Sequence, residues 1–309
     1  MGGLTEVTRL LDGTGVRATL RSLRGDVDQF DPPVEPDPHL LDPVERPFES
    51  IPDAFERLAT LERRLLERDD RRAVFLSIYV RMTEAVHGGL DEGAFADPDW
   101  MERYLVTFAD YYRRAFCDFE RGDVESVPDP WRVAFGAALG GDALVVQDAF
   151  LGVNAHINYD LAFTLADVGI DPRRPQKYAD HLAINDLLAA LVDVQQAALV
   201  DMYAEGLGDV DAALGAVDES MTLRSMTQGR EFAWRVAVVR ADVGIPPVPS
   251  YARWVVRQTA TGAAFFLLGS FLDPSLRAAL RRVEAEGMPL DVVVARVHDR
   301  VDDAAIYPD

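Results

Sequence analysis

The chain has 309 residues, 49% of them hydrophobic, so it can bury a sizeable core without disulfides or a structural metal. It contains one cysteine, which excludes an internal disulfide and a metal cluster held by thiolates. Its formal net charge of −21 leaves no basic footprint of the kind that nucleic-acid binding requires.

The acidic composition also suggests where the chain works. Lys177 is the only lysine, and the other basic residues are arginines. This resembles proteins of salt-loving archaea, because self-repulsion is tolerable when salt near 1 M shortens the Debye length to about 3 Å. Residues 1–11 lack the basic start and apolar core of a signal peptide. Residues 263–272 are about half as long as a membrane span. We therefore expect a halophilic, cytoplasmic protein without a membrane span.

Residues 1–50 are expected to form an N-terminal arm with a proline-rich connector. The beginning of the arm can form one or two amphipathic helices, although Gly13, Gly15 and Gly25 weaken that prediction. Seven prolines between residues 31 and 52 are typical of an extended connector. We expect the arm to lie on the main body or to be loosely attached to it.

Residues 51–309 are predicted to form a single all-α domain, a bundle of about ten helices around a buried central helix. Helix starts are marked by Asp97 with Pro98 and by Asp129 with Pro130, and glycines mark helix ends. Period-2 alternation is nearly absent, although residues 290–297 can be interpreted as a short strand. The predicted helices cover residues 50–68, 71–87, 97–120, 129–140, 143–169, 176–205, 209–217, 220–241, 250–270, 274–286 and 289–302.

The predicted helix at 143–169 carries an unusual set of polar side chains. Within an apolar run it places Asp148, Asn154, His156, Asn158 and Asp160. At 100° per residue, the histidine and the last aspartate share one edge, and the two asparagines lie roughly opposite. Such groups are costly to bury without partners, so we expect neighbouring helices, water or a ligand to satisfy them.

The next helix adds a second histidine. His181 lies on the apolar stripe of its helix, and the short loop before that helix makes it antiparallel to the central one. His156, Asp160 and His181 can therefore converge as ligands for Zn²⁺ or Fe²⁺, or as acid–base catalysts. The alternatives are a structural histidine–carboxylate pair and metal-free contact with a ligand.

Arg230 is the remaining candidate. It aligns with Trp234 and Ala237 on one helical face, which directs its guanidinium into the core. There it is expected either to pair with a buried carboxylate, Asp160 or Asp148, or to anchor an anionic substrate.

The motif around the central helix resembles a known family. The sequence Gly152-x-Asn154-Ala155-His156-Ile157-Asn158-x-Asp160-Leu161 resembles the signature of an uncharacterised all-helical family from halophilic archaea and bacteria, a domain of unknown function. The resemblance spans about residues 51–240 and implies a shared fold and central helix, but no substrate. It also includes Phe75, Tyr79, Thr83, the group Phe108 to Tyr112, Pro130-Trp131, and the group Arg230 to Trp234.

Three functions are consistent with these residues. The first is a metal-dependent hydrolase of a small phosphorylated or lipid-like molecule, with His156, Asp160 and His181 at the metal. In it, Asn154, Asn158 and Arg230 would bind the substrate. The second is a non-catalytic module that binds a small molecule. The third is a structural protein whose polar layer only fixes helix packing.

Overall fold

The computed structural model describes residues 20–33, 35–141, 143–186, 188, 223–269, 274–287 and 289–303. All the regular elements in these ranges are helices, which confirms the predicted all-α class. The labelled helices of the main body are α4 (Ile51–Leu66), α5 (Ala73–Asp91), α6 (Pro98–Glu120), α7 (Asp129–Gly140), α8 (Val145–Ala155), the π-helix η3 (His156–Asp160), α9 (Leu161–Val168), α12 (Leu223–Asp242), α13 (Val248–Gly269), α14 (Pro274–Gly287) and α15 (Leu290–Asp303).

Local sequence signals explain most of the helix boundaries. The Ser50 hydroxyl accepts from the Asp53 amide at 3.2 Å to start α4, and the Asp97 carboxylate accepts from the Trp100 amide at 3.2 Å to start α6. Gly141, with φ of 65°, ends α7. The predicted end at residue 87 is wrong, because α5 continues to Asp91.

The remaining predicted helices have different outcomes. Residues 174–186 are helical, as predicted for the start of the helix at 176–205, whose later part lies outside the described residues. The helix predicted at 209–217 also lies outside them. The C-terminal stretch that allowed a strand is helical, as α15.

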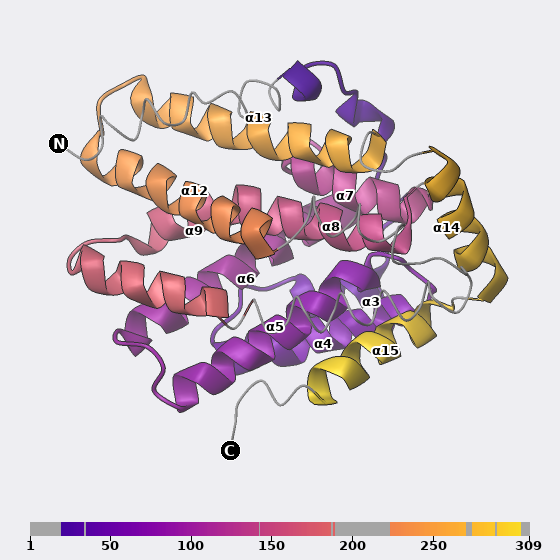
Figure 1. Ribbon diagram of the computed structural model, residues 1–309, viewed down its shortest axis with the longest axis horizontal. Coiled ribbons are helices and arrows are strands. Elements are labelled where there is room, and N and C mark those ends of the chain that lie inside the picture. Colours follow the sequence, from indigo (N-terminus) through magenta and orange to yellow (C-terminus); the bar gives the residue numbers. More distant parts are fainter. Residues whose placement is uncertain are drawn as a thin grey trace.

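The central helix is surrounded by protein, as its apolar composition predicts. In Figure 1, α8 and α9 run through the middle of the molecule, between α12 and α13 on one side and α4 and α5 on the other. α8 contacts α5, α7 and α13, whereas α9 contacts α6 and α12. No single helix among the described residues is long and apolar enough to cross a membrane. By length and composition alone, α13 together with Pro274–Ala285 would be sufficient, but the two helices are bent by 78° relative to each other.

The buried side chains form two core clusters that meet at the central helix. The first core cluster joins α4, α5, the second half of α6, α7, α8, the end of α13 and α15, and it includes Phe75, Tyr79 and Trp131. The second core cluster joins the first half of α6 to α9, α12 and the start of α13, and includes Phe108 and Ile157. The π-helix η3 therefore lies where the two clusters meet.

The proline-rich connector is a folded part of the molecule. It forms α3 (Pro38–Leu41) and η2 (Asp42–Val44), and η1 (Val27–Gln29) lies directly before it. The extended connector expected from the prolines is therefore not what the structure shows. The apolar side chains of Phe30, Leu40, Val44 and Phe48 are buried in the first core cluster. The described part of the arm is thus packed against the main body.

Arg57 of α4 holds the connector in place. Its guanidinium donates to the carbonyls of Pro43 at 2.8 Å and Pro47 at 3.1 Å, to that of Arg46, and to the carboxylate of Asp53 at 2.9 Å. These bonds satisfy carbonyls of a segment that has few backbone partners of its own. The arginine therefore replaces part of the missing regular secondary structure.

Replacing Arg57 with alanine is expected to loosen the connector. Several carbonyls lose their donor, so the free energy of unfolding should fall by about 1–3 kcal/mol, and protease cleavage within residues 37–47 should accelerate. Arg63→Ala, on the exposed side of the same helix, is the control and should leave both unchanged. Equal cleavage rates in the two variants would show that Arg57 does not hold the segment.

Candidate functional site

The central helix contains one π-turn, and it carries the candidate site. The chain is α-helical through Ala155, forms a π-helix over His156–Asp160, and returns to an α-helix at Leu161. The Leu161 amide donates to the His156 carbonyl, five residues back, and the Thr164 hydroxyl donates to the Asp160 carbonyl at 3.0 Å. Single π-turns inside α-helices occur frequently at functional sites.

The π-turn brings His156 and Asp160 together, as the sequence predicts. His156 Nδ1 lies 2.9 Å from Asp160 Oδ2, and the indole nitrogen of Trp131, on α7, donates to the same oxygen at 2.8 Å. The histidine is 3% exposed and the aspartate 0%. His156 Nε2 and Asp160 Oδ1 are buried with no hydrogen-bond partner among the described residues. The pair is thus hydrogen-bonded on one side, and on its other side it has two buried atoms without partners among the described residues.

Burial favours the uncharged forms of both groups in the pair. It raises the pKa of Asp160 well above its ordinary value, although the Trp131 N–H opposes this, and it lowers the pKa of His156 well below its ordinary value. A neutral carboxyl and a neutral imidazole share two protons, and one of them lies between Nδ1 and Oδ2. The other is on Nε2 or on Oδ1. The two unpartnered atoms therefore present one donor and one acceptor, whichever tautomer is present.

Five aromatic rings surround the His156 imidazole. The Phe108 ring is stacked on it, with ring centroids 3.5 Å apart and planes 11° apart. Tyr79 presents a T-shaped contact at 4.4 Å. The other three rings have centroids between 5.9 and 6.4 Å from that of the imidazole, and they belong to Phe75, Trp131 and Tyr112. We call these five residues the aromatic cage. Its rings surround the polar pair with mostly apolar surface, and the exception is the Tyr112 hydroxyl, which is buried without a hydrogen-bond partner among the described residues.

His181 belongs to a separate polar layer. Its Nδ1 accepts from the Tyr104 hydroxyl at 3.1 Å and lies 3.3 Å from Arg230 Nη2. Because a guanidinium only donates, Nδ1 is the acceptor and Nε2 carries the proton, which it donates to the Arg230 carbonyl at 3.3 Å. Burial and the Arg230 charge lower the pKa of His181. Both of its nitrogens are thus bonded to protein.

The three expected metal ligands are therefore not assembled as one set. His156 and Asp160 are paired, whereas His181 is bonded to Tyr104 and Arg230. Among the residues that the structure describes, no three His, Cys, Asp or Glu side chains are grouped so that they can hold a metal ion. The two layers are linked through α6, where Phe108 stacks on His156 and the ring of Tyr104 lies 6.3 Å from that of Phe108.

The two asparagines tie helices together. Asn154 Nδ2 donates to the Ala260 carbonyl of α13 at 2.9 Å, and Asn158 Nδ2 donates to Asn154 Oδ1 at 2.9 Å. On the opposite side, a Cβ added to Gly229 of α12 would lie 2.3 Å from Asn158 Oδ1, so only glycine allows this approach. These contacts give the asparagines a packing role; the substrate contact expected from the sequence stays a prediction.

Arg230 pairs with neither of the acids expected for it. Its Nε donates to Asn185 Oδ1 at 2.7 Å, and its Nη2 donates to the His181 carbonyl. Asp160 is bonded within the π-turn, and Asp148 is bonded to Arg71, with Nη2 at 2.6 Å from its Oδ2. The expected pairing is wrong because the helix register directs Arg230 into the His181 layer. An anion-binding role for Arg230 stays a prediction.

The burial of Asp148 makes the free energy of unfolding depend on pH. Burial raises its pKa to about 7, and the Arg71 charge opposes the shift. Between about pH 4 and 7 the folded state keeps a proton that the unfolded state has released, so rising pH destabilises the fold in that window and has no further effect above it. Urea denaturation gives the free energy of unfolding of the wild type and of Asp148→Asn at each pH. The value for the wild type minus the value for the variant should fall by up to about 4 kcal/mol from pH 4 to pH 8. A constant or rising difference would contradict this assignment.

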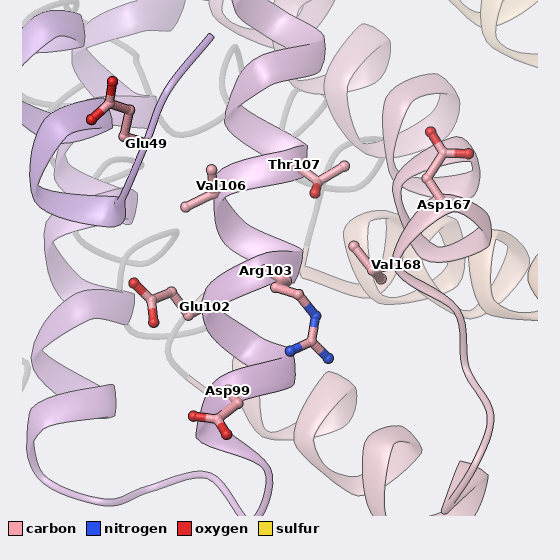
Figure 2. A pocket seen from close by; sticks show the side chains of 8 residues that line it. All are labelled: Glu49, Asp99, Glu102, Arg103, Val106, Thr107, Asp167 and Val168. Atoms are coloured by element: carbon pink, nitrogen blue, oxygen red, sulfur yellow. The ribbon is translucent and has the colours of Figure 1, made fainter.

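Two surface clefts lie away from the pair. One, of about 570 Å³, follows the outer side of α6; Figure 2 shows Arg103 near its centre with Asp99, Glu102 and Asp167 around it. The other, of about 510 Å³, lies between α14 and the start of α8 and is lined by Arg71 and Glu284 among others. Neither is lined by a residue that the sequence predicts for the site.

Sequence reasoning alone missed the partners of the candidate residues. The Trp131 indole and the aromatic cage have no polar spacing that could reveal them, but the family resemblance already included Phe75, Tyr79, Trp131 and the group Phe108 to Tyr112. Asp180 is buried and its carboxylate accepts from the amides of Ala96 and Asp97 at 2.8 Å each, which fixes the start of α6. That role depends on tertiary contacts.

Comparisons with known proteins agree with a family of this kind. A family model described as "Family of unknown function (DUF5995)" matches residues 51–269, which include α4 through α13 and therefore the His156 pair, its cage and the His181 layer. No curated protein and no solved structure matches the chain.

Proposed function

Because this chain belongs to that family of unknown function, we propose its function from the geometry of the site. In this proposal it is a small-molecule-binding helical protein whose ligand contacts His156 and Asp160. The observation that carries this proposal is the pair of buried, unpartnered atoms, His156 Nε2 and Asp160 Oδ1, inside an aromatic cage. Leaving such groups unbonded costs about 1–3 kcal/mol each, which a ligand that bonds to them would recover.

A purely structural layer is less consistent with this arrangement. Apolar residues of similar volume would pack the core without that cost, and replacing a buried polar pair in this way is often neutral or stabilising. Asn154 and His181 illustrate the structural alternative, since both polar side-chain atoms of each are bonded to protein. His156 differs from them because its Nε2 is buried without a hydrogen-bond partner among the described residues.

The metal-dependent hydrolase ranks second. His156 Nε2 is a suitable ligand atom, and a carboxylate on Nδ1 is the usual arrangement behind a metal-bound histidine. However, a zinc site requires at least three protein ligands, and the described residues offer no such group. A phosphorylated substrate would also bring negative charge to a pair whose charged forms burial disfavours.

The test is to identify what the protein carries. Protein is purified in high salt without chelator or affinity metal, then analysed by native mass spectrometry and for metal content. His156→Phe keeps a ring in the cage but removes Nε2, and the same change at His87, half-exposed on α5, is the control. We expect a small molecule in wild type and control that is absent from His156→Phe, with thermal melting confirming the fold.

Two results would contradict the proposal. The first is wild-type protein without any bound molecule, and the second is the same molecule at equal occupancy in His156→Phe. One equivalent of metal, lost in both His156→Phe and His181→Phe, would instead support the hydrolase.

A further inference from the structure

The position of His156 between the two core clusters indicates how a ligand reaches it. Within the cage, Phe75, Tyr79, Tyr112 and Trp131 belong to the first core cluster, whereas Phe108 belongs to the second. Ligand sites occur preferentially between domains and between the helices of bundles, and the boundary between the two core clusters is such a place in this fold.

Two half-buried side chains mark this boundary. Met82 of α5 and Val153 of α8 each pack against both core clusters. Val153 is three residues before His156 on the central helix, and Met82 is three residues after Tyr79 on α5, so each lies one helical turn from the site. Methionine is flexible and adapts to new neighbours, which makes Met82 suited to a side chain that moves aside.

The atoms of the pair define the kind of group it recognises. One of the two unpartnered atoms, Nε2 or Oδ1, donates and the other accepts, since the pair shares two protons. A hydroxyl both donates and accepts, so it matches either tautomer. A carboxylate or phosphate only accepts. Either anion would also place a charge beside His156 and Asp160, whose charged forms burial disfavours.

The aromatic cage indicates what kind of group the rest of the ligand is. Phe108 lies face to face with the imidazole and Tyr79 meets it edge-on, so flat rings contact the histidine both on its face and at its edge. A ring of similar size can make the same contacts beside His156 if Phe108 turns aside. A flexible aliphatic chain gains less from such surfaces and loses more conformational entropy on binding.

We propose that the ligand is a small uncharged ring compound bearing a hydroxyl group, and that it reaches His156 along the boundary between the core clusters, past Met82 and Val153. This inference rests on the proposed function and specifies its ligand class and entry route.

The first experiment compares three probes of similar size that differ in one group: phenol, toluene and benzoate. Protein labelled with ¹⁵N-histidine is titrated with each probe, and the Nε2 resonance of His156 is followed by NMR. We expect phenol to shift this resonance and to bind about tenfold more tightly than toluene, the equivalent of one neutral hydrogen bond. Benzoate should leave the resonance unchanged.

The second experiment tests the route. Met82→Trp enlarges the side chain at the boundary, and Met82→Leu, which nearly conserves its volume, is the control. We expect Met82→Trp to weaken phenol binding at least tenfold and Met82→Leu to leave it unchanged, with the His156 resonances of both free variants at the wild-type position.

The outcomes separate this inference from the proposed function. Benzoate binding as tightly as phenol, equal affinities for phenol and toluene, or no shift with any probe would each overturn the ligand class. Equal phenol affinity in Met82→Trp and Met82→Leu would overturn the route. In all these cases the proposed function is still decided by whether the purified protein carries a molecule that His156→Phe loses.

Discussion

Asp160→Ala is expected to lower the free energy of unfolding by about 3–5 kcal/mol, from two buried polar groups left without partners and the cavity that the substitution creates. This is a large fraction of the stability of an ordinary domain. The substitution leaves the Trp131 indole N–H without its acceptor and His156 Nδ1 without its hydrogen-bond partner, both in a buried place. It also opens a cavity beside the π-turn. Asp160→Asn keeps an oxygen that can accept from Trp131, so its loss should be less than half as large.

Chemical denaturation measures both effects. The control is Asp167→Ala, which removes a carboxylate that accepts from the exposed Tyr111 hydroxyl at 2.7 Å and should cost less than about 1 kcal/mol. If Asp160→Ala were no more destabilising than Asp167→Ala, the pair would not be the buried, bonded unit described above. The indole fluorescence of Trp131 should change in Asp160→Ala and not in Asp167→Ala.

Gly152→Ala is expected to cost more than about 3 kcal/mol or to prevent cooperative folding. The added Cβ would lie 2.2 Å from Cγ of Phe75 and 2.5 Å from its Cβ, a separation that atoms do not tolerate. Phe75 cannot move aside easily, because its ring packs against those of Tyr79, Tyr112 and Trp131. The strain therefore acts directly on the aromatic cage.

The control for this substitution is Gly244→Ala. A Cβ added there would meet nothing within 4 Å, so the change should be neutral or stabilising by up to about 1 kcal/mol. Gly152→Ala with Phe75→Leu should recover part of the loss, since the smaller side chain makes room for the methyl group. Thermal melting of the four proteins is the measurement. Full tolerance of Gly152→Ala alone would show that α5 does not pack closely on the central helix.

The sequence predicts the fold class well because helix signals are local. The caps at Ser50 and Asp97 and the glycine at 141 are short-range features, and they mark real helix boundaries. The connector is the exception. Its prolines indicate irregular backbone, but the donors of Arg57 that hold it come from a different helix, and no local pattern reveals them.

The candidate site is predictable in part for the same reason. His156 and Asp160 are four residues apart on one helix, so their contact follows from helical spacing. Where His181 lies depends on how two helices pack, and the packing directs it to Tyr104 and Arg230. The π-turn is also beyond local reasoning, since an i→i+5 bond has no sequence signature comparable to a helix cap.

The packing of the two flanks has a consequence for anyone who expresses only the part that the family shares. Phe30, Leu40, Val44 and Phe48 before residue 51, with Leu290, Val293 and Val297 after residue 269, all belong to the first core cluster. A fragment of residues 51–269 would expose the surfaces of α4, α5 and α7 that these side chains cover. Bare apolar area of that kind promotes aggregation, so we expect a fragment limited to the family match to be less soluble than the full chain.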